Sequence, residues 1–154
     1  MSPNVTDLPD LASRPLGGSV VFATNDLFAP RENLISPGAP EFDPAAFGLR
    51  GKIYDGWETR RHRAPDHDHA PERVRLLAAD ARTGPPEAAW REVLPPTRVQ
   101  PDTRHRFAID DGDVTTHVRL DVLPDGGLAR LRISGEIIDE ALAQLRQRWQ
   151  DALP

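Results

Sequence analysis

Residues 51–63 combine side chains that could hold and transform a small polar molecule. Two carboxylates and several guanidinium groups fall within this one stretch, among them Asp55, Glu58, Arg60 and Arg61. A guanidinium fork matches a carboxylate, and a carboxylate can move a proton. The Asp-Gly pair at 55–56 favours a turn, which would let Trp57 anchor while the charges point into a cleft. The alternative is an aromatic corner followed by solvated charges.

A second group of polar residues lies a few positions further on. It joins imidazoles and carboxylates, namely His62, Asp66, His67, Asp68 and His69. Such nitrogen and oxygen atoms are ligands for divalent metals. The segment is bracketed by Pro65 and Pro71, however, and it lacks the rigid spacing of a helical metal motif. A solvated loop is therefore the competing interpretation.

The third group lies on a stretch that alternates between apolar and polar residues. In residues 116–123, Val118, Leu120 and Val122 would face one side of a strand, and His117 and Arg119 the other. The turn residues Pro-Asp-Gly-Gly follow, and then residues 129–133 alternate again. We expect a β-hairpin with one apolar face and one charged face. The charged face, which includes Arg130 and Arg132, would either bind anions or simply meet water.

Other segments must position these side chains. Short apolar runs predict strands at residues 19–23, 72–79 and 106–109. From residue 138 the apolar residues repeat at helical spacing, at Ile138, Leu142, Leu145, Trp149 and Leu153. This amphipathic helix would dock on the sheet or pair with a second chain.

Composition limits the possible functions. The 154 residues suit one domain, and 16 prolines favour short elements joined by loops. A net charge of −5 argues against binding to nucleic acid or to an anionic membrane. The absence of cysteine excludes disulfides and thiolate chemistry, and no glycine-rich nucleotide motif is present. Without an apolar run of membrane-spanning length, a soluble cytoplasmic protein is expected.

Three stretches together resemble the allantoicase family. The first is residues 11–34, which contain Ala-Thr-Asn-Asp-Leu-Phe. The second is Gly51-Lys52 followed by Asp-Gly-Trp-Glu-Thr-Arg-Arg at 55–61. The third is Thr-His-Val-Arg-Leu at 116–120, followed by Pro-Asp-Gly-Gly and Ala-Arg-Leu-Arg. Their order and spacing cover most of residues 11–137.

The resemblance implies an all-β fold, a jelly-roll sandwich similar to galactose-binding-like domains. We expect an N-terminal arm at 1–15, a jelly-roll domain at 16–137 and a C-terminal helix at 138–154. Family members usually carry two copies of the domain, whereas this chain has one. Near residues 69–71 about thirty residues, corresponding to two core strands, are missing relative to the family pattern, so the domain is shortened.

The resemblance also implies hydrolysis of allantoate to ureidoglycolate and urea in purine breakdown. The candidate catalytic residues are Asp55, Glu58 and His117. The candidate substrate-binding residues are Arg60, Arg61, Arg119 and Arg130. His67 and Asp68 would hold a divalent metal such as manganese. Because strands and the second copy are missing, a non-catalytic remnant or small-molecule-binding module is the alternative, and a homo-oligomer could form through the helix.

Overall fold

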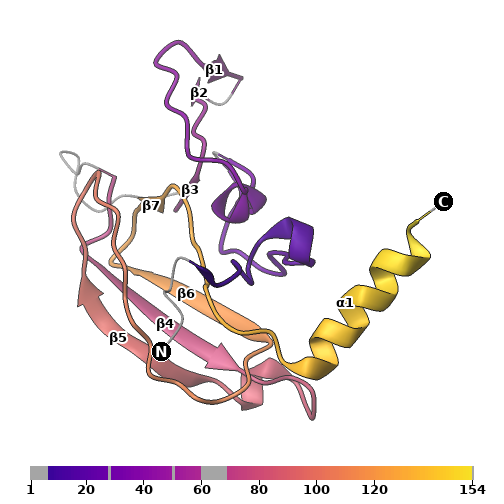
Figure 1. Cartoon of the computed structure of the whole chain (residues 1–154). Helices are drawn as coiled ribbons and strands as arrows, with labels where there is room; N and C mark the ends of the chain where they lie inside the picture. Colours follow the sequence, from indigo (N-terminus) through magenta and orange to yellow (C-terminus); the bar gives the residue numbers. More distant parts are fainter. Residues whose placement is uncertain (1–6, 28, 50, 60–68, 154) are drawn as a thin grey trace. The chain divides into compact units, whose positions relative to one another are not determined.

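The computed structural model describes residues 7–27, 29–49, 51–59 and 69–153. The chain divides into two compact units, one formed by Met1–Trp57 with Ala129–Pro154 and the other by Glu58–Leu128. Most regular elements are strands, and one α-helix, α1, lies near the C-terminus (Figure 1).

The second unit is built on a three-stranded antiparallel sheet. Its strands are β4 (Arg73–Ala79), β5 (Arg91–Arg98) and β6 (His117–Leu123), in the order β5-β4-β6 (Figure 1). The central strand β4 pairs with β6 in an unbroken register, with Leu76 opposite Leu120. A short 3-10 helix, η4 (Pro86–Ala88), lies between β4 and β5.

One face of this sheet carries the hydrophobic core of the unit. Val74, Leu76 and Leu94 are buried there, and the β6 residues that pack against them are Val118, Leu120 and Val122. The predicted apolar face of residues 116–123 is therefore confirmed. Alternate residues of a strand point to the same face, so the period-2 pattern placed these three side chains correctly.

Strand β5 continues through Pro95 and Pro96, which the sequence analysis did not include in a strand. Proline cannot donate to a ladder and is accepted on edge strands and at bulges. Both conditions hold here, because β5 is an edge strand and its register with β4 shifts between Val74 and Leu77. The two prolines are exposed.

The predicted hairpin between residues 116–123 and 129–133 is wrong. Strand β6 pairs with β4, and residues 129–133 form no strand. After the turn, β7 (Gly127–Leu128) pairs instead with β3 (Trp57–Glu58). The backbone N–H of Leu131 donates to the carbonyl of Leu34 at 2.8 Å, so this segment is held by long-range contacts rather than by its neighbour in sequence.

The first unit consists largely of loops and short elements. These are the 3-10 helices η2 (Arg14–Leu16) and η3 (Arg31–Ile35) and the two-residue strands β1 (Phe47–Gly48) and β2 (Gly51–Lys52). The strand predicted at residues 19–23 is not present, and Val21 and Phe22 are 73% and 75% exposed. Residues 106–109, in the second unit, are not a strand either. In these two segments a short apolar run was therefore not sufficient to predict a buried strand.

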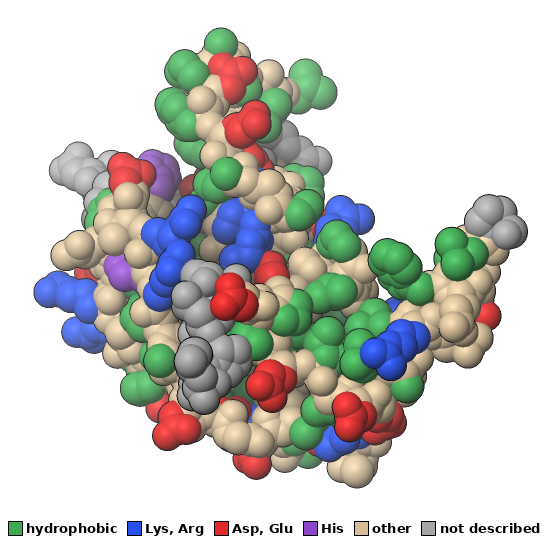
Figure 2. Space-filling view, in the orientation of Figure 1, with side chains coloured by type: hydrophobic (Ala, Val, Ile, Leu, Met, Phe, Trp, Pro, Cys, Tyr) green, Lys and Arg blue, Asp and Glu red, His purple; other side chains and the backbone are tan. Residues whose placement is uncertain are grey.

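The hairpin of β1 and β2 packs its aromatic rings around a cation. The ammonium of Lys52 lies 5.0 Å from the ring centre of Phe42 and 5.1 Å from that of Phe47. It also donates a hydrogen bond to the carbonyl of Asp43. Both rings remain largely exposed, and Figure 2 shows hydrophobic side chains on the surface of this hairpin. The cation–π contacts stabilise these rings although little of their surface is buried.

The predicted C-terminal helix is confirmed as α1 (Asp139–Asp151). Asp139 and Glu140 lie in its first turn and Arg148 in its last, which suits the helix dipole at both ends. On the apolar stripe, Leu142 and Leu145 are half-buried, whereas Trp149 is 72% exposed. Among the described residues, no helix is long and apolar enough to cross a membrane.

Candidate functional site

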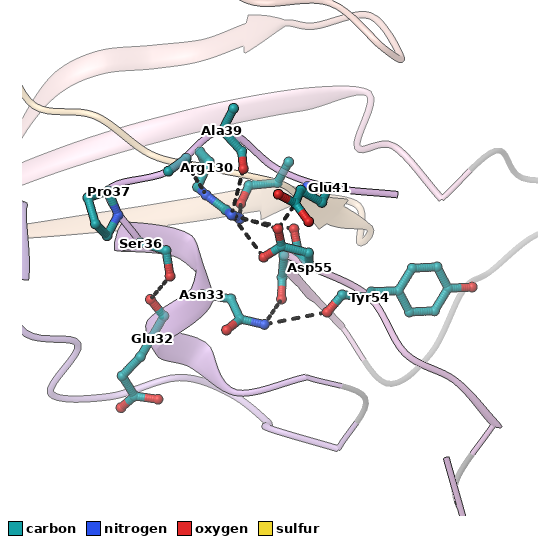
Figure 3. A network of polar contacts seen from close by, with 12 residues as sticks. Glu32, Asn33, Ser36, Pro37, Ala39, Glu41, Tyr54, Asp55 and Arg130 are labelled. Atoms are coloured by element: carbon teal, nitrogen blue, oxygen red, sulfur yellow. Dashed lines mark hydrogen bonds and ion pairs between the residues drawn. The ribbon is translucent and has the colours of Figure 1, made fainter. Parts of the chain in front are cut away.

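An ion pair between Asp55 and Arg130 organises the Asp-Gly-Trp turn of the first unit (Figure 3). One guanidinium nitrogen of Arg130, Nη2, donates to both carboxylate oxygens of Asp55 at 2.8 Å. The Arg130 side chain is only 10% exposed, and that of Asp55 is 33% exposed. Charge-assisted hydrogen bonds of this kind are stronger than those between neutral groups.

The remaining nitrogens of Arg130 donate to backbone carbonyls. Nη1 donates to the carbonyl of Asp55 at 3.0 Å and to that of Ala129 at 2.8 Å, and Nε donates to the carbonyl of Gly38 at 3.0 Å. The backbone N–H of Glu41 donates to Asp55 Oδ2 at 2.8 Å (Figure 3). Arg130 therefore ties the loop at 38–41 to the turn at 55, and protein atoms occupy its donors.

A neighbouring arginine holds the same loop. Arg132 Nη2 donates to the carbonyl of Ser36 at 2.5 Å and to that of Pro37 at 3.1 Å. Its Nε lies 3.4 Å from Oδ2 of Asp10. The two arginines of the Ala-Arg-Leu-Arg run thus both bind backbone carbonyls of residues 36–39.

Two further side chains fix the turn itself. Asn33 Nδ2 donates to the carbonyls of Tyr54 and Gly56 at 3.4 and 3.3 Å (Figure 3). The indole N–H of Trp57 donates to the carbonyl of Asn25 at 2.8 Å. A half-buried tryptophan whose N–H has a partner is the anchor that the sequence predicted.

The environment of Asp55 lowers the pKa of its carboxyl group. The main cause is the hydrogen bond from Arg130, followed by the bond from the Glu41 backbone N–H. Both favour the ionised form. A carboxylate held ionised in this way is a poor carrier of protons near neutral pH, because catalytic acids and bases work best when their pKa lies near the working pH.

Glu58 is a buried carboxylate of the second unit. Its side chain is 9% exposed, and His69 Nδ1 lies 3.6 Å from its Oε2. Next to it, Thr59 is held by the 124–127 turn, since its N–H donates to the carbonyl of Gly126 at 3.0 Å and its hydroxyl accepts from the Gly126 N–H. Glu58 is therefore a carboxylate on rigid backbone beside an imidazole, a combination able to accept and donate protons.

The same turn lies against the segment where the resemblance places the shortening. Gly126 has a φ of +133°, and a Cβ there would lie 2.7 Å from the backbone nitrogen of Pro71. The N–H of Gly127 donates to the carbonyl of His69 at 2.7 Å. Glycine is required for this approach, because any side chain would clash with backbone.

The polar face of β6 forms a charged cluster with β4. Asp121 accepts from Arg75 Nε at 3.0 Å and from Arg119 Nε at 2.8 Å. Burial raises the pKa of Asp121, but the hydrogen bonds from Arg75 and Arg119 outweigh it, and the net pKa is lowered. Nδ1 of His117 lies 2.9 Å from the hydroxyl of Thr116. Arg119 is half exposed, so its guanidinium still reaches solvent.

Four of the predicted site residues lie outside the described residues. These are the substrate-binding candidates Arg60 and Arg61 and the metal-binding candidates His67 and Asp68. Within the described ranges there is no group of three or more histidine, cysteine, aspartate or glutamate residues that could hold a metal ion. Both sets of roles stay predictions.

The side chains and backbone groups that hold the candidate residues were not predicted from the sequence. Asn33, Glu41 and Arg75 carry no motif, and each acts across a large separation in sequence or through backbone. Asn33 lies near the end of residues 11–34, the first stretch of the family resemblance, and this was the one available signal. Arg75 sits opposite Asp121 in the β4–β6 register, so correct strand pairing would have identified it.

These features define a protein whose regular elements are mostly strands, in which distant arginines clamp an Asp-Gly-Trp turn. The allantoicase repeat model matches residues 9–78 and again residues 69–138, so the matches together cover most of the chain. The chain belongs to the allantoicase family.

Relatives named "Probable allantoicase" support this assignment. The chain is 44% identical to that of Nocardia farcinica, over 85% of this chain and 49% of the relative. It is 35% identical to that of Streptomyces coelicolor, over 92% of this chain and 40% of the relative. The crystal structure of allantoicase from Saccharomyces cerevisiae superposes with a TM-score of 0.70 at 28% identity, covering 86% of this chain and 49% of that one.

The chain spans about half the length of the curated relatives that it matches. The alignment with the Nocardia relative runs over 162 positions, whereas 85% of the 154 residues is about 131. About 31 positions of the relative, the difference between 162 and 131, therefore face gaps in this chain.

Proposed function

We propose that this chain hydrolyses allantoate to ureidoglycolate and urea, the activity for which its family is named. The observation that carries the proposal is the pair of matches to the family repeat, at residues 9–78 and 69–138, which together include all the candidate site residues. The clamped Asp-Gly-Trp turn adds support, since the charged residues in it form specific contacts. The chain itself spans only about half the length of these relatives.

The reaction sets three tasks for protein side chains. The substrate carboxylate must be anchored, a water molecule or the geminal carbon must be activated, and the departing urea must be protonated. Guanidinium groups suit the first task. We assign it to Arg60, Arg61 and the half-exposed Arg119.

Proton transfer is assigned to Glu58 and His117. Glu58 is buried beside His69, and His117 adds an imidazole, a side chain that commonly serves as a general acid or base. A carboxylate that is shielded from water can act as a base for an attacking water molecule and then as an acid for the leaving group.

For Asp55 and Arg130 we propose a positioning role. The family resemblance implied acid–base catalysis for Asp55 and substrate binding for Arg130. Arg130 donates to Asp55 and to three backbone carbonyls, and the pKa of Asp55 is lowered by Arg130. A pair engaged in this way is suited to hold the turn in place rather than to meet substrate.

We propose that residues 16–137 form a shortened jelly-roll domain similar to galactose-binding-like domains. The three-stranded sheet of the second unit and the alignment gaps relative to the family are consistent with a sandwich that lacks two strands.

We further propose that His67 and Asp68 bind a divalent metal such as manganese and that the protein is cytoplasmic. We also propose that the chain associates with itself through α1, whose Trp149 is exposed.

A second candidate function is a folded module that binds a small carboxylate without cleaving it. It is favoured by the half-length coverage and the gapped alignment. The two functions differ in product formation but share the arginine ligands.

The test measures urea release from allantoate and heat of allantoate binding in the same preparation, with and without manganese. Release of urea at enzymatic rates supports the hydrolase. Binding without urea release from a protein that unfolds cooperatively supports the binding module. A folded chain that neither binds allantoate nor releases urea would overturn both functions. A comparison of Arg119→Ala with Arg98→Ala, an exposed arginine of β5, distinguishes a specific ligand from general charge.

A further inference from the structure

The outer edge of β6 has no strand beside it among the residues that the structure describes. The sheet order β5-β4-β6 places β4 in the middle and leaves one edge on β5 and one on β6. The backbone hydrogen bonds of β6 and its immediate neighbours run to the β4 side, for example from Thr116 N–H to the Ala79 carbonyl. An edge strand presents a row of N–H and C=O groups that another strand can join.

The two edges differ in how they are protected. Strand β5 contains Pro95 and Pro96 and shifts register against β4, both of which are devices that discourage further pairing. Strand β6 has neither proline nor glycine and pairs in an unbroken register over its seven residues. The apolar face of β6 is also only half-buried at Val118, Leu120 and Val122. A further strand would therefore pair more readily with the edge of β6 than with the edge of β5.

The sequence of β6 is complementary to itself when it is reversed about Leu120. In an antiparallel pair of two such strands, Leu120 faces Leu120, and Val118 faces Val122 on the apolar side. On the polar side, Arg119 of each strand faces Asp121 of the other. Only the outermost pair, His117 with Leu123, is unlike. Opposite charges and apolar side chains placed directly across two strands stabilise their pairing.

We propose that two copies of this chain pair through β6, antiparallel and centred on Leu120. The two sheets then become one six-stranded sheet with a two-fold axis at Leu120, and each interface residue meets its counterpart by symmetry. Asp121, which already accepts from Arg75 and Arg119 of its own chain, lies opposite Arg119 of the second copy. The occupant is a second copy because of this self-complementary charge pattern. The pairing shares Arg119 with the proposed substrate site, so it is tested by the association state of the chain and not by its activity.

The main test is sedimentation velocity of the full chain over a range of concentrations, for the natural protein and three variants. Arg119→Asp puts two acidic pairs across the interface, so its dimer dissociation constant should rise by about tenfold or more. Asp121→Arg combined with Arg119→Asp restores opposite charges and should recover much of the dimer. Arg98→Asp, the same change on the exposed β5 edge, should leave it unchanged.

Because Asp121 also holds Arg75, the double variant needs a second readout that does not depend on it. The chain has no cysteine, so a single Leu120→Cys can report on the two-fold axis. Mild oxidation should yield a disulfide-linked dimer, since residues directly opposite in an antiparallel pair lie within disulfide range. Val93→Cys, at a half-buried position of the β5 edge, should not cross-link. A monomeric natural protein, a dimer indifferent to Arg119→Asp, or equal cross-linking at both positions would overturn the proposal.

Discussion

Nη2 of Arg130 lies 2.8 Å from both carboxylate oxygens of Asp55, across 75 positions of sequence. The same guanidinium also reaches the carbonyls of Gly38, Asp55 and Ala129. One side chain thus joins three segments of the first unit. It does so from a position that is almost fully buried, where an unpaired charge would be costly.

The first prediction concerns the shape of the Arg130 side chain. Arg130→Lys keeps the positive charge but loses the planar fork, and it should lower the free energy of unfolding by about 1–3 kcal/mol. Guanidinium chloride denaturation followed by the fluorescence of Trp57 and its fellow tryptophans measures this loss. The matched control is Arg98→Lys on the exposed part of β5, which should change stability by less than about 0.5 kcal/mol. Equal effects of the two changes would show that the clamp contributes nothing.

The second prediction concerns acid. The pKa of Asp55 in the folded protein lies below its ordinary value of 3.8, so folding favours the ionised form. This contribution to stability is fully present above pH 3.8 and is lost as the pH falls through the lower, folded pKa. Asp55→Asn should therefore be less stable than the natural protein at pH 6, and the difference should shrink in strongly acidic buffer. Melting temperatures measured from pH 6 to pH 2 test this, and parallel curves would contradict it.

A third prediction follows from the close approach of the 124–127 turn to Pro71. Gly126→Ala combines a positive φ with a Cβ 2.7 Å from the Pro71 nitrogen, and it should cost about 2–4 kcal/mol. Gly112→Ala is the control, because a Cβ there meets nothing within 4 Å. Chemical denaturation of both variants gives the comparison. If Gly126→Ala were as stable as Gly112→Ala, the turn would not lie against Pro71 as described.

A fourth prediction tests the core of the three-stranded sheet. Leu94→Ala removes a buried side chain of β5 and should destabilise the protein by about 2–4 kcal/mol through lost burial and a residual cavity. Leu153→Ala, at a position 68% exposed, should have an effect below about 0.5 kcal/mol. The midpoints of thermal unfolding report both changes. A small loss at Leu94 would mean that the β5 edge is not packed on β4.

Sequence patterns predicted those elements whose signal is local. The alternation in β6 and the helical spacing in α1 each depend on residues within a few positions, and both elements formed where they were expected. The indole of Trp57 was likewise identified as an anchor from its residue type and its place beside a turn.

Predictions that depended on partners were less successful. The turn at 124–127 suggested that its flanking segments pair with each other. Instead, β6 pairs with β4, and the backbone N–H of Leu131 donates to the carbonyl of Leu34. Strand β5 was not predicted because it contains Pro95 and Pro96. Proline fits a strand only at a sheet edge or a bulge, and the sequence does not show which strands lie at an edge. The ion pair of Asp55 with Arg130 could not be derived for the same reason. Residue types and spacing identified both residues as candidates, but they did not show that the two side chains contact each other.

The measurement that tests the central proposal most directly is urea release from allantoate by the natural chain, Glu58→Gln and Glu87→Gln, with manganese present and absent. Glu58 is buried beside His69, whereas Glu87 is exposed in the short 3-10 helix η4, so the two changes are chemically identical in different surroundings. The account predicts enzymatic release by the natural chain and by Glu87→Gln, and a fall of about 10²–10⁴-fold for Glu58→Gln. Undiminished release by a folded Glu58→Gln, or no release by any of the three folded proteins, would contradict it.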